Sequence, residues 1–191
     1  MSKTEFLKPG NFIYPVPAVM VSCGSMEGEK NIITVAWTGT VCSDPPMAYI
    51  SVRPERYSYH ILKEGMEFVI NLPDNDLANA LDFCGCTSGE KIDKFSKCGL
   101  TPEKSSKVKA PSILEAPVSI ECRCTQILEL GTHHMFLAEV LAVRVDDRYL
   151  DEKGVFHMEE VGLLAYEHGR YRELGGTLGT FGYSVRRKQK K

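Results

Sequence analysis

The sequence has no long hydrophobic run and no large excess of charge of one sign. A membrane-spanning helix needs about 20 consecutive apolar residues, and the amino-terminal MSKTEFLKPG also lacks the apolar core of a secretory signal. We therefore expect a cytoplasmic protein with no membrane partner. The net charge of −2 argues against general nucleic-acid binding, which relies on a basic surface.

The signatures of several common catalytic sites are also missing. No G-x-G-x-x-G follows a strand, so no Rossmann dinucleotide site is indicated, and there is no Walker A loop. No G-x-S-x-G supports an esterase. His133 and His134 are adjacent, so in a strand they point to opposite faces and cannot hold one metal ion together.

Seven cysteines, an odd number, do not predict a disulfide scaffold in a chain without a secretory signal. They include two C-x-C pairs, whereas metal-binding knuckles usually have C-x₂-C spacing. Cys122 and Cys124 alternate along VSIECRCTQI, so we expect both to face the core as small hydrophobic side chains. Cys84 and Cys86 flank a glycine and are better candidates for reactive thiols. We predict no metal site.

The 191 residues, 43% of them hydrophobic, suit a single domain over residues 1–191 with a substantial core. Apolar runs bounded by glycine and proline predict strands, and helical spacing predicts short helices. Predicted strands cover residues 18–23, 31–37, 47–52, 67–72, 117–130, 133–146 and a hairpin at 163–166 and 170–172. Predicted helices cover residues 57–63, 75–83 and 90–96. Residues 38–40 are expected to break the chain direction, 98–111 to form an exposed polar connection, and 186–191 to be a solvated basic tail.

The predicted strand at residues 133–146 is apolar on both faces. Such a strand is expected to be covered on both sides. In an antiparallel barrel the second cover is often a partner subunit, which favours a homodimer. A helix packed outside the barrel is the alternative.

Two arginines, Arg53 and Arg56, follow the strand at residues 47–52 and precede a predicted helix. Pro54 suits a first helical turn, and Ser58 can act as an N-cap. Guanidinium forks beside free backbone N–H groups suit a phosphate. Two solvated surface arginines are the alternative interpretation.

The motifs NIITVAWTG, SDPP and ISVRPERYSY, followed by FVINLP, SGEKIDKF and FGYSVR, together resemble the flavin reductase-like FMN-binding split-barrel family, within it the flavoredoxin branch. The resemblance runs from about Pro15 to the end of the chain. It implies a mainly β fold, an antiparallel split β-barrel of Greek-key type with short flanking helices. It also implies FMN as the cofactor, because the family binds FMN, although the residues alone do not exclude FAD.

The resemblance implies a set of cofactor-binding residues. The isoalloxazine would lie along Thr34, Val35, Ala36, Trp37 and Thr38, and the ribityl phosphate would be held by Ser51, Val52, Arg53, Arg56, Tyr57 and Ser58. Asn71 would bond the ribityl or the ring, and Lys94, with Lys91 and Asp93, would belong to a lid. His168 and Tyr171 are candidates for the open face of the flavin. The alternatives are core packing for Trp37, a strand-end turn for Asn71 and solvated helix charges for the lid residues.

Two functions from different classes follow from the resemblance. One is an FMN-dependent oxidoreductase that takes a hydride from NAD(P)H and passes electrons to an acceptor; no catalytic acid or base is evident. The other is a flavoredoxin-type carrier that receives electrons from a reduced redox protein. A module that binds a phosphate compound other than a flavin is a third possibility.

Overall fold

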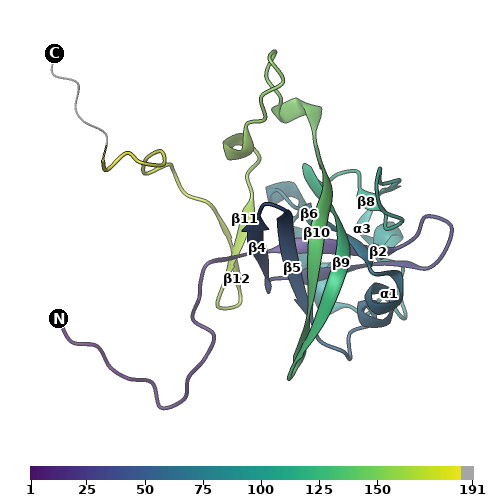
Figure 1. Ribbon diagram of the computed structural model, residues 1–191, viewed down its shortest axis with the longest axis horizontal. Coiled ribbons are helices and arrows are strands. Elements are labelled where there is room, and N and C mark those ends of the chain that lie inside the picture. The colour runs from purple at the N-terminus through teal and green to yellow at the C-terminus, as the bar shows by residue number, and fades with distance from the viewer. Residues whose placement is uncertain (186–191) are drawn as a thin grey trace.

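The computed structural model describes residues 1–185 of the chain. Most of these residues belong to a mainly antiparallel β-structure with a few short helices at its edges (Figure 1). One sheet has the order β3-β2-β6-β9-β10-β5-β4. Its strands are β2 (Val19–Gly24), β3 (Lys30–Val35), β4 (Thr38–Ser43), β5 (Pro46–Val52), β6 (Glu67–Leu72), β9 (Val118–Leu130) and β10 (His133–Val145).

Smaller elements surround this sheet. A second sheet has the order β1-β11-β12, and a short pair joins β7 to β8. These strands are β1 (Val16–Pro17), β7 (Pro102–Glu103), β8 (Ser112–Ile113), β11 (Leu164–Glu167) and β12 (Arg170–Glu173). The helices are α1 (Ser58–Gly65), α2 (Ala78–Cys86) and α3 (Lys94–Cys98), with 3₁₀ turns at Asn75–Leu77, Asp147–Tyr149 and Met158–Glu160.

The two edges of the large sheet meet at Ala36 and Trp37. β3 and β4 stand at opposite ends of the strand order, yet only these two residues connect them. Because an extended residue spans at most about 3.6 Å, the sheet must roll up until its edges meet. The Ser51 amide donates to the Trp37 carbonyl at 2.8 Å and fastens this meeting point. The sheet is therefore a barrel that is closed at one point and split beyond it.

Two apolar clusters support the barrel. The first fills its interior and includes Phe68, Phe136 and Leu62, with Cys122 and Cys124 among the buried side chains. The prediction that these two cysteines act as small core residues is thus confirmed. The second cluster lies between β2–β3 and the helices α2 and α3, with members such as Met20, Ile32, Leu81, Cys84 and Phe95. This second cluster fixes both helices against the outer side of β3.

Several predicted elements are confirmed. β6 has the predicted bounds, and the hairpins β2–β3, β9–β10 and β11–β12 all form. The predicted break at residues 38–40 was wrong, because these residues begin β4 and pair with β5, Gly39 opposite Tyr49. The Tyr49 ring lies close to Gly39, so cross-strand packing compensates for the weak strand preference of glycine.

The predicted helix starts also need correction. α1 begins at Ser58 rather than after it, and Tyr57 occupies the N-cap without a side-chain bond. The Ser58 hydroxyl instead accepts a hydrogen bond from Asn31 Nδ2 at 2.8 Å. α3 begins at Lys94, later than predicted, because the Asp93 carboxylate accepts from the Phe95 and Ser96 amides and caps the helix there.

The connection at residues 98–111 is less exposed than predicted. Leu100, Val108 and Ala110 are buried, and the buried Glu121 carboxylate accepts hydrogen bonds from the Ser106 and Lys107 amides. The predicted basic tail at 186–191, with the last residue of the FGYSVR motif, lies outside the described residues. The segments before β1 and after β12 both leave the sheet on the side of the β11–β12 hairpin (Figure 1).

Candidate functional site

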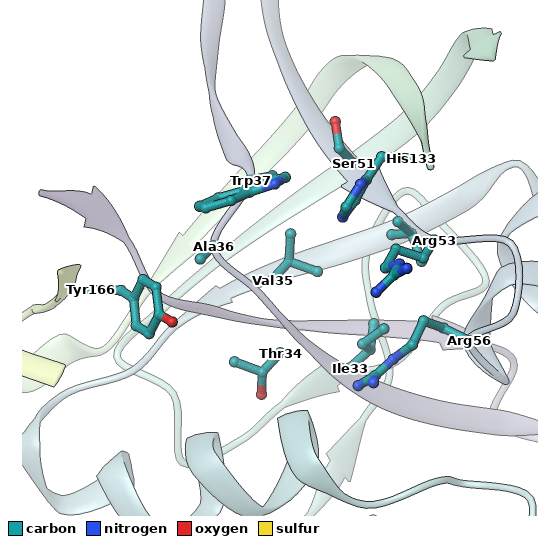
Figure 2. Close-up of a pocket in the computed structure, with 11 residues that line it drawn as sticks. Ile33, Thr34, Val35, Ala36, Trp37, Ser51, Arg53, Arg56, His133 and Tyr166 are labelled. Atoms are coloured by element: carbon teal, nitrogen blue, oxygen red, sulfur yellow. The ribbon is translucent and has the colours of Figure 1, made fainter. Parts of the chain in front are cut away.

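A cavity of about 240 Å³ opens where the two edges of the barrel diverge from Ala36 and Trp37. We call it the seam pocket. It is lined by Ile33, Thr34, Val35, Ala36, Trp37, Ser51, Val52, Arg53, Arg56, His133 and Tyr166. β3 supplies one wall, and the end of β5 with the turn after it supplies the opposite wall (Figure 2).

The main chain of β3 presents unpaired groups along this pocket. The Ser25 amide donates to the Glu29 carbonyl at the hairpin end, which sets the alternation of paired and unpaired positions. By that alternation the amide and carbonyl groups of Ile32, Thr34 and Ala36 face away from β2. The Ile32 carbonyl accepts from Lys94 Nζ at 2.7 Å on that open side, which agrees with this alternation. Thr34 and Ala36 therefore direct backbone donors and acceptors to the seam.

Two guanidinium groups stand opposite this strand edge. Arg53 and Arg56 extend into the pocket from one side, facing Ala36, Trp37 and Tyr166 across it (Figure 2). The Arg56 amide donates to the Arg53 carbonyl at 3.0 Å, so a tight turn holds both residues together. Arg56 Nη2 also donates to the Gly85 carbonyl at the end of α2. The turn thus concentrates positive charge at one end of the seam.

Arg53 is only partly committed to another residue. Its Nε lies 2.8 Å from Glu55 Oε1, and both side chains are about half exposed. An exposed pair of this kind contributes little stability. The guanidinium therefore keeps donors that a bound anion can use.

A second cavity of about 240 Å³ adjoins the seam pocket, with Ile33 and Arg56 in both walls. We call it the helix pocket because the first turn of α1 forms one side. It is lined by Asn31, Ile33, Glu55, Arg56, Tyr57, Ser58, Cys86, Thr87, Ser88, Gly89 and Lys94. Hydroxyl-bearing residues, two cationic side chains and the Glu55 carboxylate thus surround a space next to a helix start.

Lys94 is the most deeply buried cation at this site, with 3% of the residue exposed. Its ammonium donates to the Ile32 and Cys84 carbonyls at 2.7 and 2.8 Å. Burial lowers the pKa of Lys94 from its ordinary value, while the neighbouring Cys84 thiol acts in the opposite direction. Lys94 therefore joins the edge of β3 to the end of α2 and presents a partly desolvated amine to the helix pocket.

The structure brings together most of the residues that the sequence singled out. Thr34, Val35, Ala36, Trp37, Ser51, Val52, Arg53 and Arg56 line the seam pocket, and Arg56, Tyr57, Ser58 and Lys94 line the helix pocket. Trp37 is half-buried and lines the pocket rather than joining either main apolar cluster. This placement favours the pocket-wall interpretation of Trp37 over core packing.

Thr38 and Asn71 line neither pocket. Thr38 is buried and its hydroxyl donates to the Tyr49 carbonyl at 2.6 Å. The fully buried Asn71 amide donates to the Met20 carbonyl and the Ser22 hydroxyl, and its carbonyl accepts from the Ile113 amide. Both side chains hold strands together, and neither belongs to the site proposed below.

The remaining predicted residues lie around the site. Asp93 caps α3, and Lys91 lines neither of the two pockets. His168 lies at the β11–β12 turn against Tyr14, with 4.5 Å between ring centroids. Tyr171 packs against Tyr166, and burial together with Asp82 raises the pKa of Tyr171 to about 12.

Sequence reasoning missed several lining residues. His133, at the start of β10, was considered only as a metal ligand, yet it lines the seam pocket, where burial and then the Arg53 charge lower its pKa. Tyr166 was read only as a hairpin residue. Gly89 lines the helix pocket, and a Cβ there would lie 2.2 Å from Asn31 Oδ1. The glycine itself is the signal in the sequence, because glycine often marks a close approach of the backbone.

Among residues 1–185, no three histidine, cysteine, aspartate or glutamate side chains gather closely enough to hold a metal ion. No helix in the same range is long and apolar enough to cross a membrane.

Comparisons with known proteins identify the family and the fold. A family model described as "Flavin reductase like domain" matches residues 11–175. The structure is similar to flavoredoxin of Desulfovibrio vulgaris (Miyazaki F), with a TM-score of 0.86, 30% identity, and coverage of 96% of this chain and 99% of that chain. It is also similar to flavoredoxin from Methanosarcina acetivorans, with a TM-score of 0.82, 27% identity, and coverage of 96% and 100%.

A further relative in sequence is the reductase component of a 4-nitrophenol 4-monooxygenase/4-nitrocatechol 2-monooxygenase from Rhodococcus opacus. It is 28% identical over 142 residues, which cover 74% of this chain and 71% of the relative. The family match spans most of the chain and the fold is the split barrel that the motifs predicted. The chain therefore belongs to the flavin reductase-like family, in its flavoredoxin branch.

Proposed function

We propose that the protein is an oxidoreductase that binds one FMN without a covalent bond, takes electrons from NAD(P)H and passes them to an acceptor. The observation that supports this most is the seam pocket, where an unpaired strand edge faces two arginines. A flavin carries its own redox chemistry, accepting a hydride or single electrons. The protein has to bind, orient and shield it.

The seam pocket suits the ring system of FMN. The ring needs backbone donors and acceptors along its polar edge and apolar cover over its face. Thr34 and Ala36 offer the former, and Trp37, Val35 and Tyr166 the latter. The proposed ring position is therefore between β3 and the end of β5, with the small Ala36 side chain allowing close approach.

The helix pocket suits the phosphate. Arg56 stands at the junction of the two cavities, and Lys94 and the hydroxyls of Ser58 and Ser88 line the second one. Charge-assisted hydrogen bonds to a phosphate are roughly twice as strong as neutral ones. We propose that Arg56 and Lys94 bind the phosphate in the helix pocket, with Arg53 bonding the ribityl–phosphate chain from the seam side. Together these cations offset the charge of a dianion.

A flavoredoxin-type electron carrier is the second candidate. It is favoured by the two flavoredoxin structures that match nearly the full chain. The relation to a monooxygenase reductase component favours the enzyme instead. A carrier and an enzyme can use the same flavin site, so the electron donor decides between them.

The test is an anaerobic reduction of the FMN-loaded protein. We expect NADH or NADPH to bleach the flavin absorbance rapidly and to full extent. Bleaching by a reduced ferredoxin but by neither pyridine nucleotide would establish the carrier instead. Failure to take up added FMN would refute both and leave a module for another phosphate compound.

We also propose a homodimer, with the flavin near the interface. Val143 on β10 is 57% exposed although apolar, and the terminal segments carry exposed Leu7, Ile13 and Leu178. A second copy would remove these side chains from water. Sedimentation equilibrium should give twice the chain mass, and Val143→Glu should shift the protein toward monomer; a monomeric wild type would refute this arrangement.

A further inference from the structure

A third cavity adjoins the seam pocket on the side of the amino-terminal segment. We call it the arm pocket; its volume is about 360 Å³. Residues 10–13 and Val16 form its outer wall, and Tyr49 and Met135 contribute from β5 and β10. Ala36, Trp37 and Ser51 line both this cavity and the seam pocket. The two spaces are thus neighbours that share the Trp37 wall.

The two neighbouring cavities differ in charge. The seam pocket contains Arg53, Arg56 and His133, whereas none of the ten residues lining the arm pocket carries an ionisable acid or base that is charged at neutral pH. Its polar groups are uncharged: the amide of Asn11 and the hydroxyls of Tyr49 and Ser51. An anionic group placed there would lose its water without gaining a cation, which is unfavourable.

Aromatic contacts hold the outer wall in place. Phe12 meets His168 edge-on at 5.6 Å between ring centroids, and Tyr14 lies 4.5 Å from the same ring. Tyr14 also approaches Trp37, at 6.3 Å. The β11–β12 hairpin therefore steadies the segment that closes the arm pocket, and the cavity is bounded largely by aromatic and aliphatic side chains.

We propose that the arm pocket binds an uncharged ring compound that carries a carbonyl or hydroxyl oxygen, and that such a compound is the electron acceptor. The acceptor role rests on the proposed flavin function; the binding does not. A quinone bound there would gain two electrons and two protons from the reduced cofactor, which would return to its oxidised form, and the quinone would leave as the hydroquinone. Asn11, Tyr49 and Ser51 supply hydrogen bonds to the ring oxygen, and Trp37 and Met135 contact the ring.

The chain offers built-in reporters for this binding. Trp37 is the only tryptophan in the sequence, so tryptophan fluorescence reports directly on the wall of the arm pocket that Trp37 forms. The Met135 methyl group can be followed by NMR after methyl labelling. Two probes of matched size separate charge from shape: 4-methylacetophenone is neutral and 4-methylbenzoate is an anion.

We expect 4-methylacetophenone to shift the Met135 methyl signal and to bind about tenfold or more tightly than 4-methylbenzoate. Met135→Glu should weaken the neutral probe by about tenfold or more, since it places a carboxylate in the wall. Leu137→Glu is the matched control, because Leu137 lies two residues along the same strand face and lines none of the three cavities described here. That control should leave binding unchanged.

Equal affinity for the two probes, or no shift at Met135, would overturn the proposal even if the variants failed to fold. Binding that appears only at dilutions where the protein is monomeric would also overturn it, since a second copy would then occupy the cavity. FMN uptake is measured separately by flavin absorbance. Probe binding without FMN uptake would refute the proposed flavin function but support the ring site in the arm pocket. FMN uptake without probe binding would refute the ring site but support the flavin function.

Discussion

Polar side chains have different surroundings at the seam between β3 and β5 and on β6, an inner strand of the same sheet. On β6, the Asn71 side chain is fully buried and bonds to neighbouring strands and to Ile113 on β8. At the seam, β3 has a paired strand on one side only, and Arg53 is half exposed beside a cavity. Polar side chains therefore bond strands to one another in one region, and in the other they line a cavity that is open to a ligand.

This difference shows what decides the role of a polar residue in such a fold. Asn31 and Asn71 are both buried asparagines beside β-branched runs. Asn31 bonds Ser58 at the edge of the helix pocket, whereas Asn71 bonds groups on β2, β6 and β9 and the Ile113 amide of β8, and lines neither pocket. Position relative to the split, rather than residue type, separates the asparagine that lines a pocket from the one that bonds only within the fold.

The largest expected effect comes from breaking the closed region. Asn71→Ala should lower the free energy of unfolding by about 3 kcal/mol, because it leaves several buried donors and acceptors unpaired. Urea unfolding measures the loss, with Asn79→Ala on the exposed side of α2 as a control that should change stability little. The folded fraction should bind FMN as the wild type does. A tenfold loss of FMN affinity at constant stability would instead assign Asn71 to the ligand site.

The next effect comes from removing charge at the seam. Arg53→Ala should weaken FMN binding by about 1.5–3 kcal/mol, the range for a hydrogen bond to a charged group. Unfolding stability should change little, since the ion pair with Glu55 is exposed. Arg148→Ala is a matched control, because Arg148 also pairs with a nearby carboxylate, that of Asp146, but lines neither pocket. Equal FMN affinity for both variants would show that the seam does not use Arg53.

A smaller effect is expected at the helix pocket. Gly89→Ala places a methyl group within 2.2 Å of Asn31 Oδ1, so Asn31 must move and its bond to Ser58 is strained. We expect FMN binding to weaken by about 1–2 kcal/mol, in the range of overpacking costs. Gly65→Ala meets no atom within 4 Å and serves as the control. Isothermal titration with FMN distinguishes them, and the same affinity in both would place the phosphate elsewhere.

The smallest effect is a pH dependence at His133. Burial and the Arg53 charge lower the pKa of His133 below its ordinary value of 6.5, so the unfolded chain binds this proton more readily. The wild type should therefore lose stability as pH falls from 6.5 through the lowered pKa. His133→Gln should lose less stability between about pH 8 and about pH 5 in urea unfolding. An equal loss in both proteins would show that His133 is as solvated when folded as when unfolded.

The strands were the most predictable part of the fold. β6 could be placed residue by residue because FVINLP has a β-branched core and ends at a proline. β4 was missed because glycine has a low strand preference. Gly39 is in a strand because it pairs with Tyr49, and this pairing cannot be recognised from the residues next to Gly39. The helix at α3 was predicted to start at residue 90, but it starts at Lys94, because the Asp93 side chain caps it there.

The site was predictable where it is continuous in sequence. The β3–β4 connection and the Arg53–Ser58 turn each supply a run of neighbouring lining residues. His133 and Tyr166 were not assigned to the site because each reaches the seam from a hairpin far along the chain. Asn71 illustrates a related point: whether a strand-end asparagine lines a pocket depends on which strands flank it, and local sequence does not show those strands.

The central claim is that FMN lies across the seam and helix pockets. The most direct measurement is a titration of the protein with FMN, followed by the fluorescence of Trp37 in the seam wall. We predict saturable quenching at one FMN per chain, weakened in Arg53→Ala and unchanged in Arg148→Ala. Full FMN uptake that leaves Trp37 fluorescence unquenched, or no uptake at all, would contradict this account.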